Sequence, residues 1–146
     1  MNPLLSLLGA FWRRWRALQA LCIGRSHLAR LAGAGRGIRV GADAQFHGHK
    51  GIRIADDVVI GPRAILRAQE SYPWTDPPQA FTPSIEIGRG TFLSHDVHIA
   101  CVHRIVIGEE VMLADRCYVA DNTHGYEDPL RSVKSQPLRV LGEVRI

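Results

Sequence analysis

The chain has 146 residues, the length of one ordinary domain. Hydrophobic residues make up 46% of it and charged residues 22%, which excludes disordered, collagen-like and membrane-spanning classes. The net charge of +4 comes from residues 1–50, where eight Lys and Arg oppose one acid, Asp43. The remaining residues are net acidic, so the basic total does not indicate a nucleic-acid partner.

Residues 1–37 are predicted to form an N-terminal amphipathic helical segment and a Gly-rich hinge. The apolar run from Leu4 to Cys22 is interrupted by Arg13, Arg14 and Arg16. It is too short to cross a bilayer, and it lacks the preceding basic region of a signal peptide. Two alternatives stay open: the helix lies on a membrane surface, or it packs on the domain or a partner subunit. Glycines 33, 35 and 37 lack the flanking strand and helix of a dinucleotide site, so they indicate a hinge.

The three cysteines, Cys22, Cys101 and Cys117, are an odd number without C-x-x-C spacing. This pattern argues against a disulfide framework and against a structural zinc cluster. We expect buried, small apolar side chains in a reducing compartment, which places the protein in the cytoplasm.

Residues 38–146 carry a six-residue repeat in which an aliphatic residue is followed by a small one. Each hexad is expected to supply one short strand, with its aliphatic side chain inward, and one turn. Three hexads then close a triangular coil of about 18 residues. A β-sandwich would not keep a fixed six-residue phase. The repeat pairs are Ile54-Ala55, Ile60-Gly61, Ile87-Gly88, Leu93-Ser94, Ile99-Ala100, Ile107-Gly108, Leu113-Ala114 and Val119-Ala120.

The repeat has irregularities that predict where the chain leaves the coil. Ile87 and Ile107 are 20 residues apart, so the corner at 101–104 is expected to hold two extra residues. The repeat is lost at 66–85 and again from 124 to about 141, and loops that leave a regular scaffold often carry function. About four coils remain, and we expect the β-helix domain, 38–146, to be truncated at its C-terminal end.

The repeat, and above all its segment 107–125, resembles the hexapeptide-repeat acyltransferases. It is similar to the sugar O-acetyltransferase branch that modifies lipopolysaccharide, capsule and exopolysaccharide. The resemblance implies an all-β fold, a left-handed parallel β-helix, here with an N-terminal α-helical segment, and a homotrimer with active sites between adjacent helices. The handedness comes from the resemblance alone, because ordinary parallel crossovers are right-handed. The resemblance is carried by Ile107-Gly108, Val111, Leu113-Ala114, Cys117-Tyr118-Val119-Ala120-Asp121-Asn122-Thr123-His124-Gly125, Tyr126-Glu127-Asp128-Pro129 and Gln136-Pro137.

In that branch, a histidine directly after the last hexad of a coil serves as the catalytic base, and His124 occupies this position. The resemblance implies transfer of an acetyl group from acetyl-CoA to a sugar hydroxyl, with no metal; the residues that bind acetyl-CoA are unknown. An imidazole can take the hydroxyl proton near neutral pH and return it to the leaving thiolate. Because no activated Ser or Cys arrangement appears, we expect direct attack without an acyl-enzyme.

A neighbouring group must hold the base in one tautomer. The candidates are Asp121, Asn122, Glu127, Asp128 or a backbone carbonyl. Substrate-binding or orienting roles are assigned to Asn122, Asp96 and Asp128, and Asp96 falls where the family often has a polar active-site residue.

Other functions remain as alternatives. His95 and His98 point to opposite faces of a strand, so they do not chelate one ion together. A γ-type carbonic anhydrase would need His95, His98 and His124 to meet at a subunit interface. A non-catalytic or truncated β-helix remnant is the third interpretation. Tyr72 and Trp74 are expected either to stack on a sugar ring or to anchor their loop.

Overall fold

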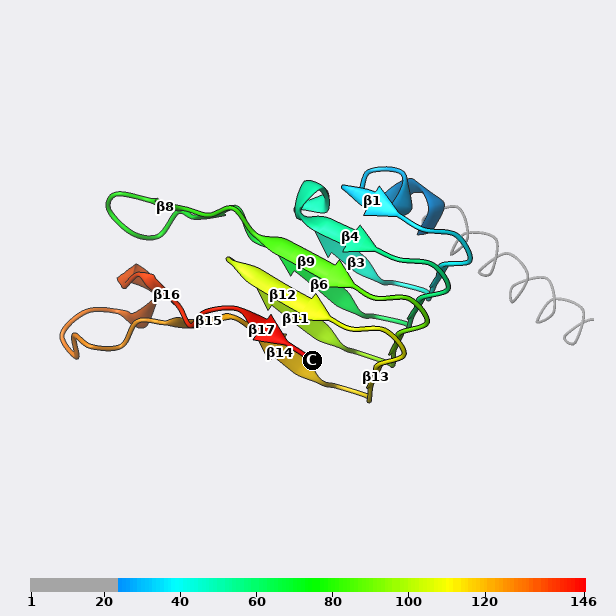
Figure 1. The fold of residues 1–146 in the computed structure, drawn as a ribbon. Coiled ribbons are helices and arrows are strands. Elements are labelled where there is room, and N and C mark those ends of the chain that lie inside the picture. Colours follow the sequence, from blue (N-terminus) through cyan, green and yellow to red (C-terminus); the bar gives the residue numbers. More distant parts are fainter. Residues whose placement is uncertain (1–23) are drawn as a thin grey trace, which may run out of the picture.

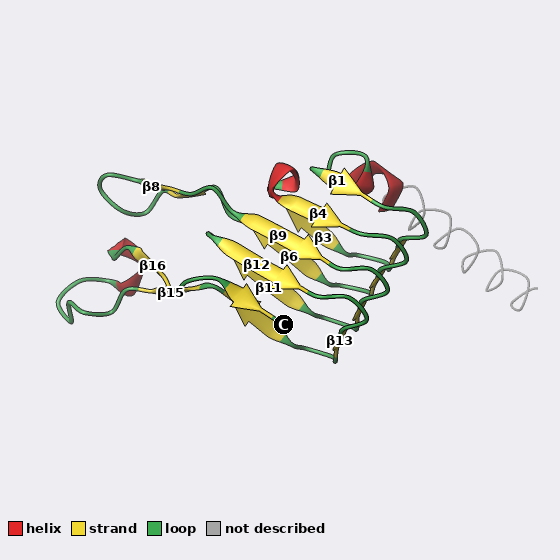
Figure 2. Cartoon of the chain, in the orientation of Figure 1, coloured by secondary structure: helices red, strands yellow, loops and turns green. Residues whose placement is uncertain are grey.

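The computed structural model of the protein describes residues 24–146 (Figure 1). The helix predicted over the first part of the chain lies outside the described residues, apart from one helical turn at 24–28. Strands dominate the rest, and the other helical segments are two 3₁₀ turns, η1 (His49–Gly51) and η2 (Val133–Ser135) (Figure 2). No helix among the described residues is long and apolar enough to cross a membrane.

Three parallel sheets form the body of the molecule, and the chain visits them in turn. We call them sheets A, B and C. The all-β prediction is confirmed to this extent: the structure is mostly strands in parallel sheets. Sheet A holds β1 (Gly33–Ala34), β4 (Ile52–Ile54), β9 (Ser84–Ile87), β12 (Arg104–Ile107) and β17 (Val144–Arg145); sheet B holds β2 (Arg39–Val40), β5 (Val59–Ile60), β10 (Phe92–Leu93) and β13 (Met112–Leu113); sheet C holds β3 (Gln45–His47), β6 (Ile65–Ala68), β11 (His98–Cys101) and β14 (Tyr118–Ala120).

The aliphatic residues of the hexads form one continuous core. Ile52, Ile85 and Ile105 stack in sheet A and are fully buried, and the equivalent aliphatic side chains of sheets B and C pack against them. Because each strand pairs with the coil before and the coil after it, the backbone polar groups of the inner strands are satisfied.

The spacing between stacked strands corrects the predicted coil length. Gln45 pairs with Ile65 and His98 with Tyr118, so one coil takes 20 residues and not about 18. The two extra residues are therefore not peculiar to 101–104. In the first coil the same corner, between sheets C and A, holds the 3₁₀ turn η1.

The two long insertions also leave the coil at the corner between sheets C and A. The first contains the antiparallel pair β7 (Ser71–Tyr72) and β8 (Gln79–Ala80), and the second contains β15 (Asn122–His124) and β16 (Leu138–Val140). We call them the first hairpin and the second hairpin. They project from the same side of the coil, on the left in Figure 1. The loss of the repeat in these two stretches thus predicted real departures from the coil.

The Gly-rich segment is not a hinge outside the sheets. Gly33 and Ala34 form β1 and pair with Arg53 and Ile54, so the coil begins before residue 38. Gly35 is needed for packing: a Cβ there would lie 2.5 Å from the backbone nitrogen of Asp56. The prediction failed because two-residue strands with small side chains leave no apolar pattern in the sequence.

Candidate functional site

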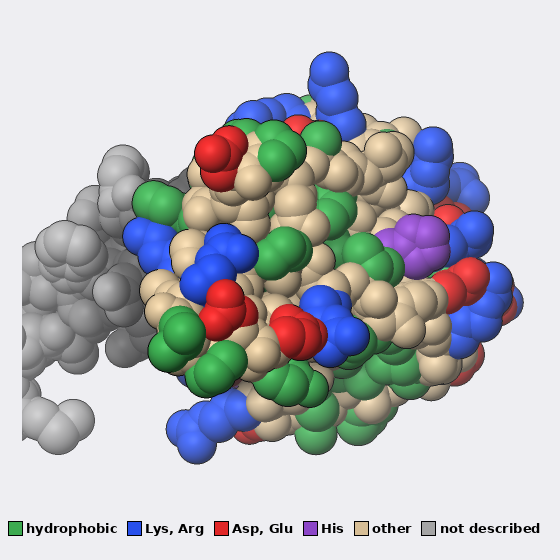
Figure 3. Space-filling view, turned by 90° about the vertical axis from the view of Figure 1, so that its left-hand side faces the viewer, with side chains coloured by type: hydrophobic (Ala, Val, Ile, Leu, Met, Phe, Trp, Pro, Cys, Tyr) green, Lys and Arg blue, Asp and Glu red, His purple; other side chains and the backbone are tan. Residues whose placement is uncertain are grey.

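A pocket of about 270 Å³ lies where the two hairpins leave sheet C. Both hairpins and strands β6, β11 and β14 contribute to its wall, so residues distant in the sequence meet there. Figure 3 views the molecule from the side on which the hairpins project and shows Lys and Arg side chains spread over that face. The pocket is lined by Arg67, Gln69, Tyr72, Pro73, Trp74, His98, Ala100, Tyr118, Asn122, His124 and Leu138.

His124 ends β15 and is exposed at this pocket. Its strand leaves the coil directly after sheet C and pairs with β16, so that His124 lies opposite Leu138. The side chain of Leu138 is buried with Tyr72 and Val102 in a small second core. That small core holds the second hairpin against the coil, and it therefore also holds the backbone of His124 in place.

Tyr72, from the first hairpin, contacts the imidazole. Its hydroxyl group lies 3.4 Å from Nδ1 of His124 and donates a hydrogen bond of 2.6 Å to the carbonyl oxygen of Lys134. Since the only hydroxyl proton is used there, the tyrosine oxygen faces Nδ1 as an acceptor. This favours the tautomer with its proton on Nδ1 and leaves Nε2 free to accept a proton.

The two hairpins are also joined through Gln79. Its side chain accepts a hydrogen bond of 2.7 Å from the nitrogen of Leu138 and donates one of 3.1 Å to the oxygen of the same residue. Above the pocket, Nζ of Lys134 lies 3.4 Å from the ring centroid of Trp74. The first hairpin is therefore anchored to the second, which supports the anchoring alternative for Tyr72, while Trp74 stays half-exposed at the pocket.

His98 lies in the same wall, edge-on to Tyr118 with 5.1 Å between ring centroids. Its Nε2 atom is buried and has no hydrogen-bond partner in the described structure. Burial lowers the pKa of His98, and the positive charges of Arg67 and His47 lower it further. A neutral imidazole therefore lies beside the pocket near physiological pH.

Asp121 is fully buried and does not orient His124. It accepts hydrogen bonds from the backbone nitrogens of Val102 and His103, at 2.9 and 2.8 Å, and contacts Sγ of Cys101 at 3.2 Å. Burial alone raises the pKa of Asp121, but these hydrogen bonds together lower it. The carboxylate holds the corner at 101–104 in place. Burial, and in addition the hydrogen bond and charge of Asp121, raise the pKa of the Cys101 thiol to about 12.

Of the other predicted orienting residues on the second hairpin, only Asn122 lies at the pocket. Asn122 lines the pocket, and its amide nitrogen donates to the oxygen of Ala100 and to Asp121, each at 3.1 Å. Asp128 instead belongs to the outer part of the second hairpin, where it accepts from the nitrogen of Leu130 at 2.9 Å. Glu127 forms an ion pair of 2.5 Å with Arg139 and does not face His124.

Asp96 lies at another corner of the coil and does not join the site. It adopts a positive φ of 57° and forms a two-pronged ion pair with Arg63, both contacts at 2.7 Å. Asp43, Arg63 and Arg116 adopt the same left-handed conformation at equivalent turns. Asp96 is therefore a turn residue, whose type suits the left-handed region.

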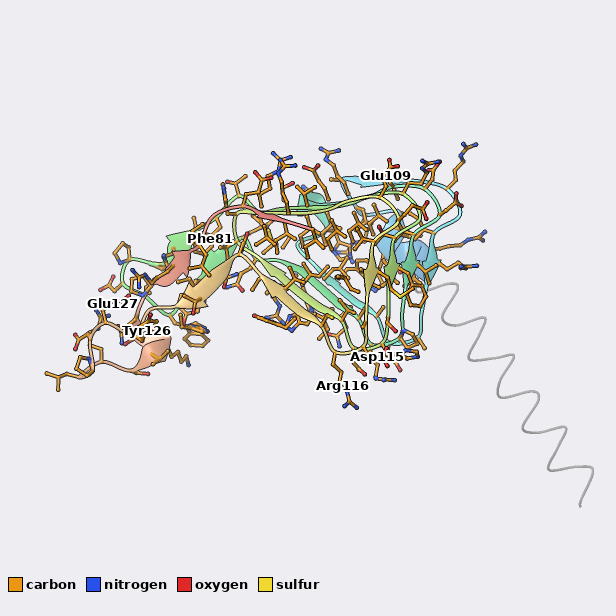
Figure 4. The ribbon with its side chains drawn as sticks, turned by 60° about the horizontal axis from the view of Figure 1, so that its bottom comes forward. Phe81, Glu109, Asp115, Arg116, Tyr126 and Glu127 are labelled. Carbon is orange, nitrogen blue, oxygen red and sulfur yellow. The ribbon has the colours of Figure 1, made fainter. Side chains whose placement is uncertain are left out.

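His95 also lies away from His124. It contacts Asp115 at 3.3 Å, and Figure 4 shows Asp115 and Arg116 at a corner remote from Tyr126 and Glu127 on the second hairpin. His98 and His124 share the pocket, but His95 does not come with them in one chain. Among residues 24–146 no group of three His, Cys, Asp or Glu is placed to hold a metal ion.

Sequence reasoning missed Tyr72 as the group that contacts His124. In the sequence, Tyr72 is simply an aromatic residue in the stretch where the repeat is lost, and such a residue can have several roles. Comparisons with protein-family models, curated proteins and solved structures found no match to the chain.

Proposed function

We propose that the protein is an O-acetyltransferase that moves an acetyl group from acetyl-CoA to a sugar hydroxyl. The acceptor is a surface polysaccharide or its precursor, and His124 is the general base. One observation carries the proposal: His124 lies at a pocket with Nδ1 against the Tyr72 hydroxyl, whose proton is committed to Lys134. The resemblance of 107–125 to sugar O-acetyltransferases supplies the substrate class.

The chemistry follows from the free Nε2 of His124. Nε2 takes the proton of the acceptor hydroxyl as its oxygen attacks the thioester carbonyl, forming the new C–O bond. Nε2 then returns the proton as the C–S bond breaks, so the products are the acetyl ester and a thiol. The Tyr72 oxygen stabilises the imidazolium that exists between these two steps, because it accepts from Nδ1.

The fold and the assembly belong to the same proposal. A left-handed coil and a homotrimer with active sites between neighbouring helices are what the resemblance implies. The outer face of sheet B supports an assembly, because Phe92 and Met112 stack on adjacent strands with 36% and 73% of their surfaces exposed. Both cysteines in the described part of the chain are free, which fits the expected cytoplasmic location.

Thiol release from acetyl-CoA in the presence of a panel of sugar acceptors tests this function. We expect turnover by the wild type and a loss of about 100-fold or more in kcat for His124→Ala, the usual contribution of a general base. His103→Ala is the matched control, because His103 is exposed and is not a pocket residue. Undiminished transfer by His124→Ala would remove the proposed base.

The γ-type carbonic anhydrase alternative draws on the shared pocket of His98 and His124. Its third imidazole would have to come from another subunit. Metal analysis of the purified protein distinguishes the two functions: stoichiometric zinc that is lost in His124→Ala supports the metalloenzyme. A folded protein that neither binds acetyl-CoA nor zinc supports the non-catalytic alternative.

A further inference from the structure

The pocket at His124 has an unbalanced positive charge. Its lining contains one arginine, Arg67, and no Asp or Glu. Arg67 projects from the outer face of β6 and is exposed. Within residues 24–146 it has no acidic partner within ion-pair distance. Other described arginines, such as Arg53 and Arg116, also lack an ion pair, but Arg67 is the one arginine that lines the pocket at His124.

The neighbours of Arg67 do not compensate its charge. His98 is held neutral by burial and by Arg67 itself, and its buried Nε2 lacks a partner. A second groove, of about 390 Å³, shares Arg67 and Gln69 with the first and is lined by one acid, Glu70, and by His47. Arg67 and Gln69 thus line both hollows, whereas Glu70 lines only the second and His124 only the first.

An arginine is suited to a planar, anionic partner. Its guanidinium group forms paired, charge-assisted hydrogen bonds with a carboxylate or a phosphate. The aromatic rings of Trp74 and Tyr118 in the same pocket offer apolar surfaces for the C–H faces of a sugar ring. At about 270 Å³ the pocket is slightly smaller than the roughly 300–1,000 Å³ of drug-sized sites, which suits a single sugar unit.

We propose that the acceptor is an acidic saccharide whose anionic group, a carboxylate or a phosphate, binds Arg67 while its hydroxyl lies at His124. This inference rests on the proposed acetyltransferase function. It narrows the acceptor class from sugars in general to sugars that carry a negative charge.

The test compares acceptors that differ only in charge. Thiol release from acetyl-CoA is measured with a methyl glucuronide, a glucose phosphate and the neutral methyl glucoside, for the wild type, Arg67→Gln and Arg116→Gln. Arg116 is the matched control because it is exposed at a corner remote from the second hairpin (Figure 4). The first two acceptors distinguish a carboxylate from a phosphate as the preferred group.

We expect wild-type kcat/KM to be higher for one acidic acceptor than for the neutral one. Arg67→Gln should lower that value about tenfold or more, the effect of losing a charge-assisted hydrogen bond, and should lower kcat/KM for the neutral acceptor much less. Arg116→Gln should behave as wild type. Equal losses for charged and neutral acceptors, or a preference for the neutral one, would overturn the proposal.

A binding measurement keeps this inference separate from the proposed function. Calorimetric titration of wild type and Arg67→Gln with the same three saccharides needs no turnover. If the acidic saccharide binds in an Arg67-dependent manner but no acetyl transfer occurs, the anion site stands and the acetyltransferase function fails. If transfer occurs without any dependence on Arg67 or on acceptor charge, the function stands and the anion site fails.

Discussion

At the scale of single residues, two buried polar groups set the geometry around the pocket. Tyr72 is 5% exposed and uses its hydroxyl group between His124 and the backbone of Lys134. Asp121 is fully buried and stabilises the corner from which β12 begins. One of them acts on the imidazole directly, while the other shapes the backbone beneath it. Their removal should therefore have different consequences.

Replacing Tyr72 with Phe removes the hydroxyl group and keeps the ring in the small core. We expect kcat to fall about tenfold, because Nδ1 of His124 loses its acceptor, while KM changes little. The free energy of unfolding should fall by about 1 kcal/mol through the lost bond to Lys134. Steady-state kinetics and urea denaturation measure the two effects. Tyr126→Phe, on an exposed ring of the second hairpin, is the control; a matching loss there would refute the specific role.

Replacing Asp121 with Asn should lower the free energy of unfolding at pH 7 by about 2 kcal/mol. The amide cannot accept from all the donors that surround the carboxylate, and its own NH₂ group faces them. Asp76→Asn, on an exposed residue of the first hairpin, should change it by less than about 0.5 kcal/mol. Chemical denaturation of both variants measures this.

The pH dependence of the Asp121 contribution has a definite sign. The pKa of Asp121 is lowered below the ordinary value of 3.8, so the folded state favours the charged form. Its stabilisation is present above pH 3.8 and is lost as the pH falls from there through the folded-state pKa. The difference between wild type and Asp121→Asn should thus shrink under acid conditions; a constant difference would argue against a charged Asp121.

At the scale of elements, the short helical turn at 24–28 is held to the first coil by a contact between two imidazoles. Nδ1 of His27 lies 3.0 Å from Nε2 of His49, and the ring of His27 also stacks on Phe46. Burial lowers the pKa of both histidines, and the charge of Arg30 lowers each further, with a smaller effect of His47. The contact needs at least one neutral ring, because one nitrogen must accept.

Acidification should therefore loosen this contact. Because both pKa values lie below 6.5 in the fold, its stabilisation is complete above pH 6.5 and is lost as the pH falls from there. The amide of Ala32, which donates to the oxygens of His49 and Ile52, reports the opening by hydrogen exchange. We expect its protection factor to be lower at about pH 5.5 than at about pH 7.5.

Two controls accompany the exchange measurement. The amide of Gly61, which bonds to the oxygen of Leu93 within the coil, should keep its protection over the same range. In His49→Phe, which keeps an aromatic ring but cannot titrate at this position, the protection of Ala32 should depend less on pH, because only His27 still titrates in the contact. If the pH dependence is unchanged, the contact between the two imidazoles is not the cause.

At the scale of the whole molecule, each coil repeats the same corners, so that features of one coil stack on those of the next. Both hairpins leave at the corner between sheets C and A, and they meet there because the coils that emit them are close in the stack. On sheet B, the same stacking brings apolar side chains into one column. Val59, Phe92 and Met112 are in register on the outer face of this sheet.

The apolar column on sheet B leads to a prediction about assembly. In light scattering, the wild type should have the mass of a trimer, and Met112→Glu should shift it toward the monomer, because a buried charge opposes the interface. Glu109→Gln, an exposed change in the turn between β12 and β13, should leave the mass unchanged. A wild-type monomer, or a trimer insensitive to Met112→Glu, would contradict this interface.

The sequence alone determined the strand-rich class, the inward aliphatic residues and the two departures from the coil, because a short repeat fixes which side chains are buried. It also singled out His124 and Asn122, which the structure places at one pocket. It did not indicate that Asp96 lies, within one chain, at a turn outside this pocket, because a turn residue and a site residue share the same residue type. The coil length of 20 residues was also missed, because the extra residues at the corner do not disturb the repeat within each coil.

Only the tertiary structure decided which side chains meet. Tyr72 and His124 are 52 residues apart, and no local pattern in either hairpin predicts their contact. Arg67 likewise shares a pocket with His124 because strands from different coils lie side by side. The register between stacked coils brings these residues together. That register depends on the number of residues in each corner and insertion, and the hexad pattern does not encode this number.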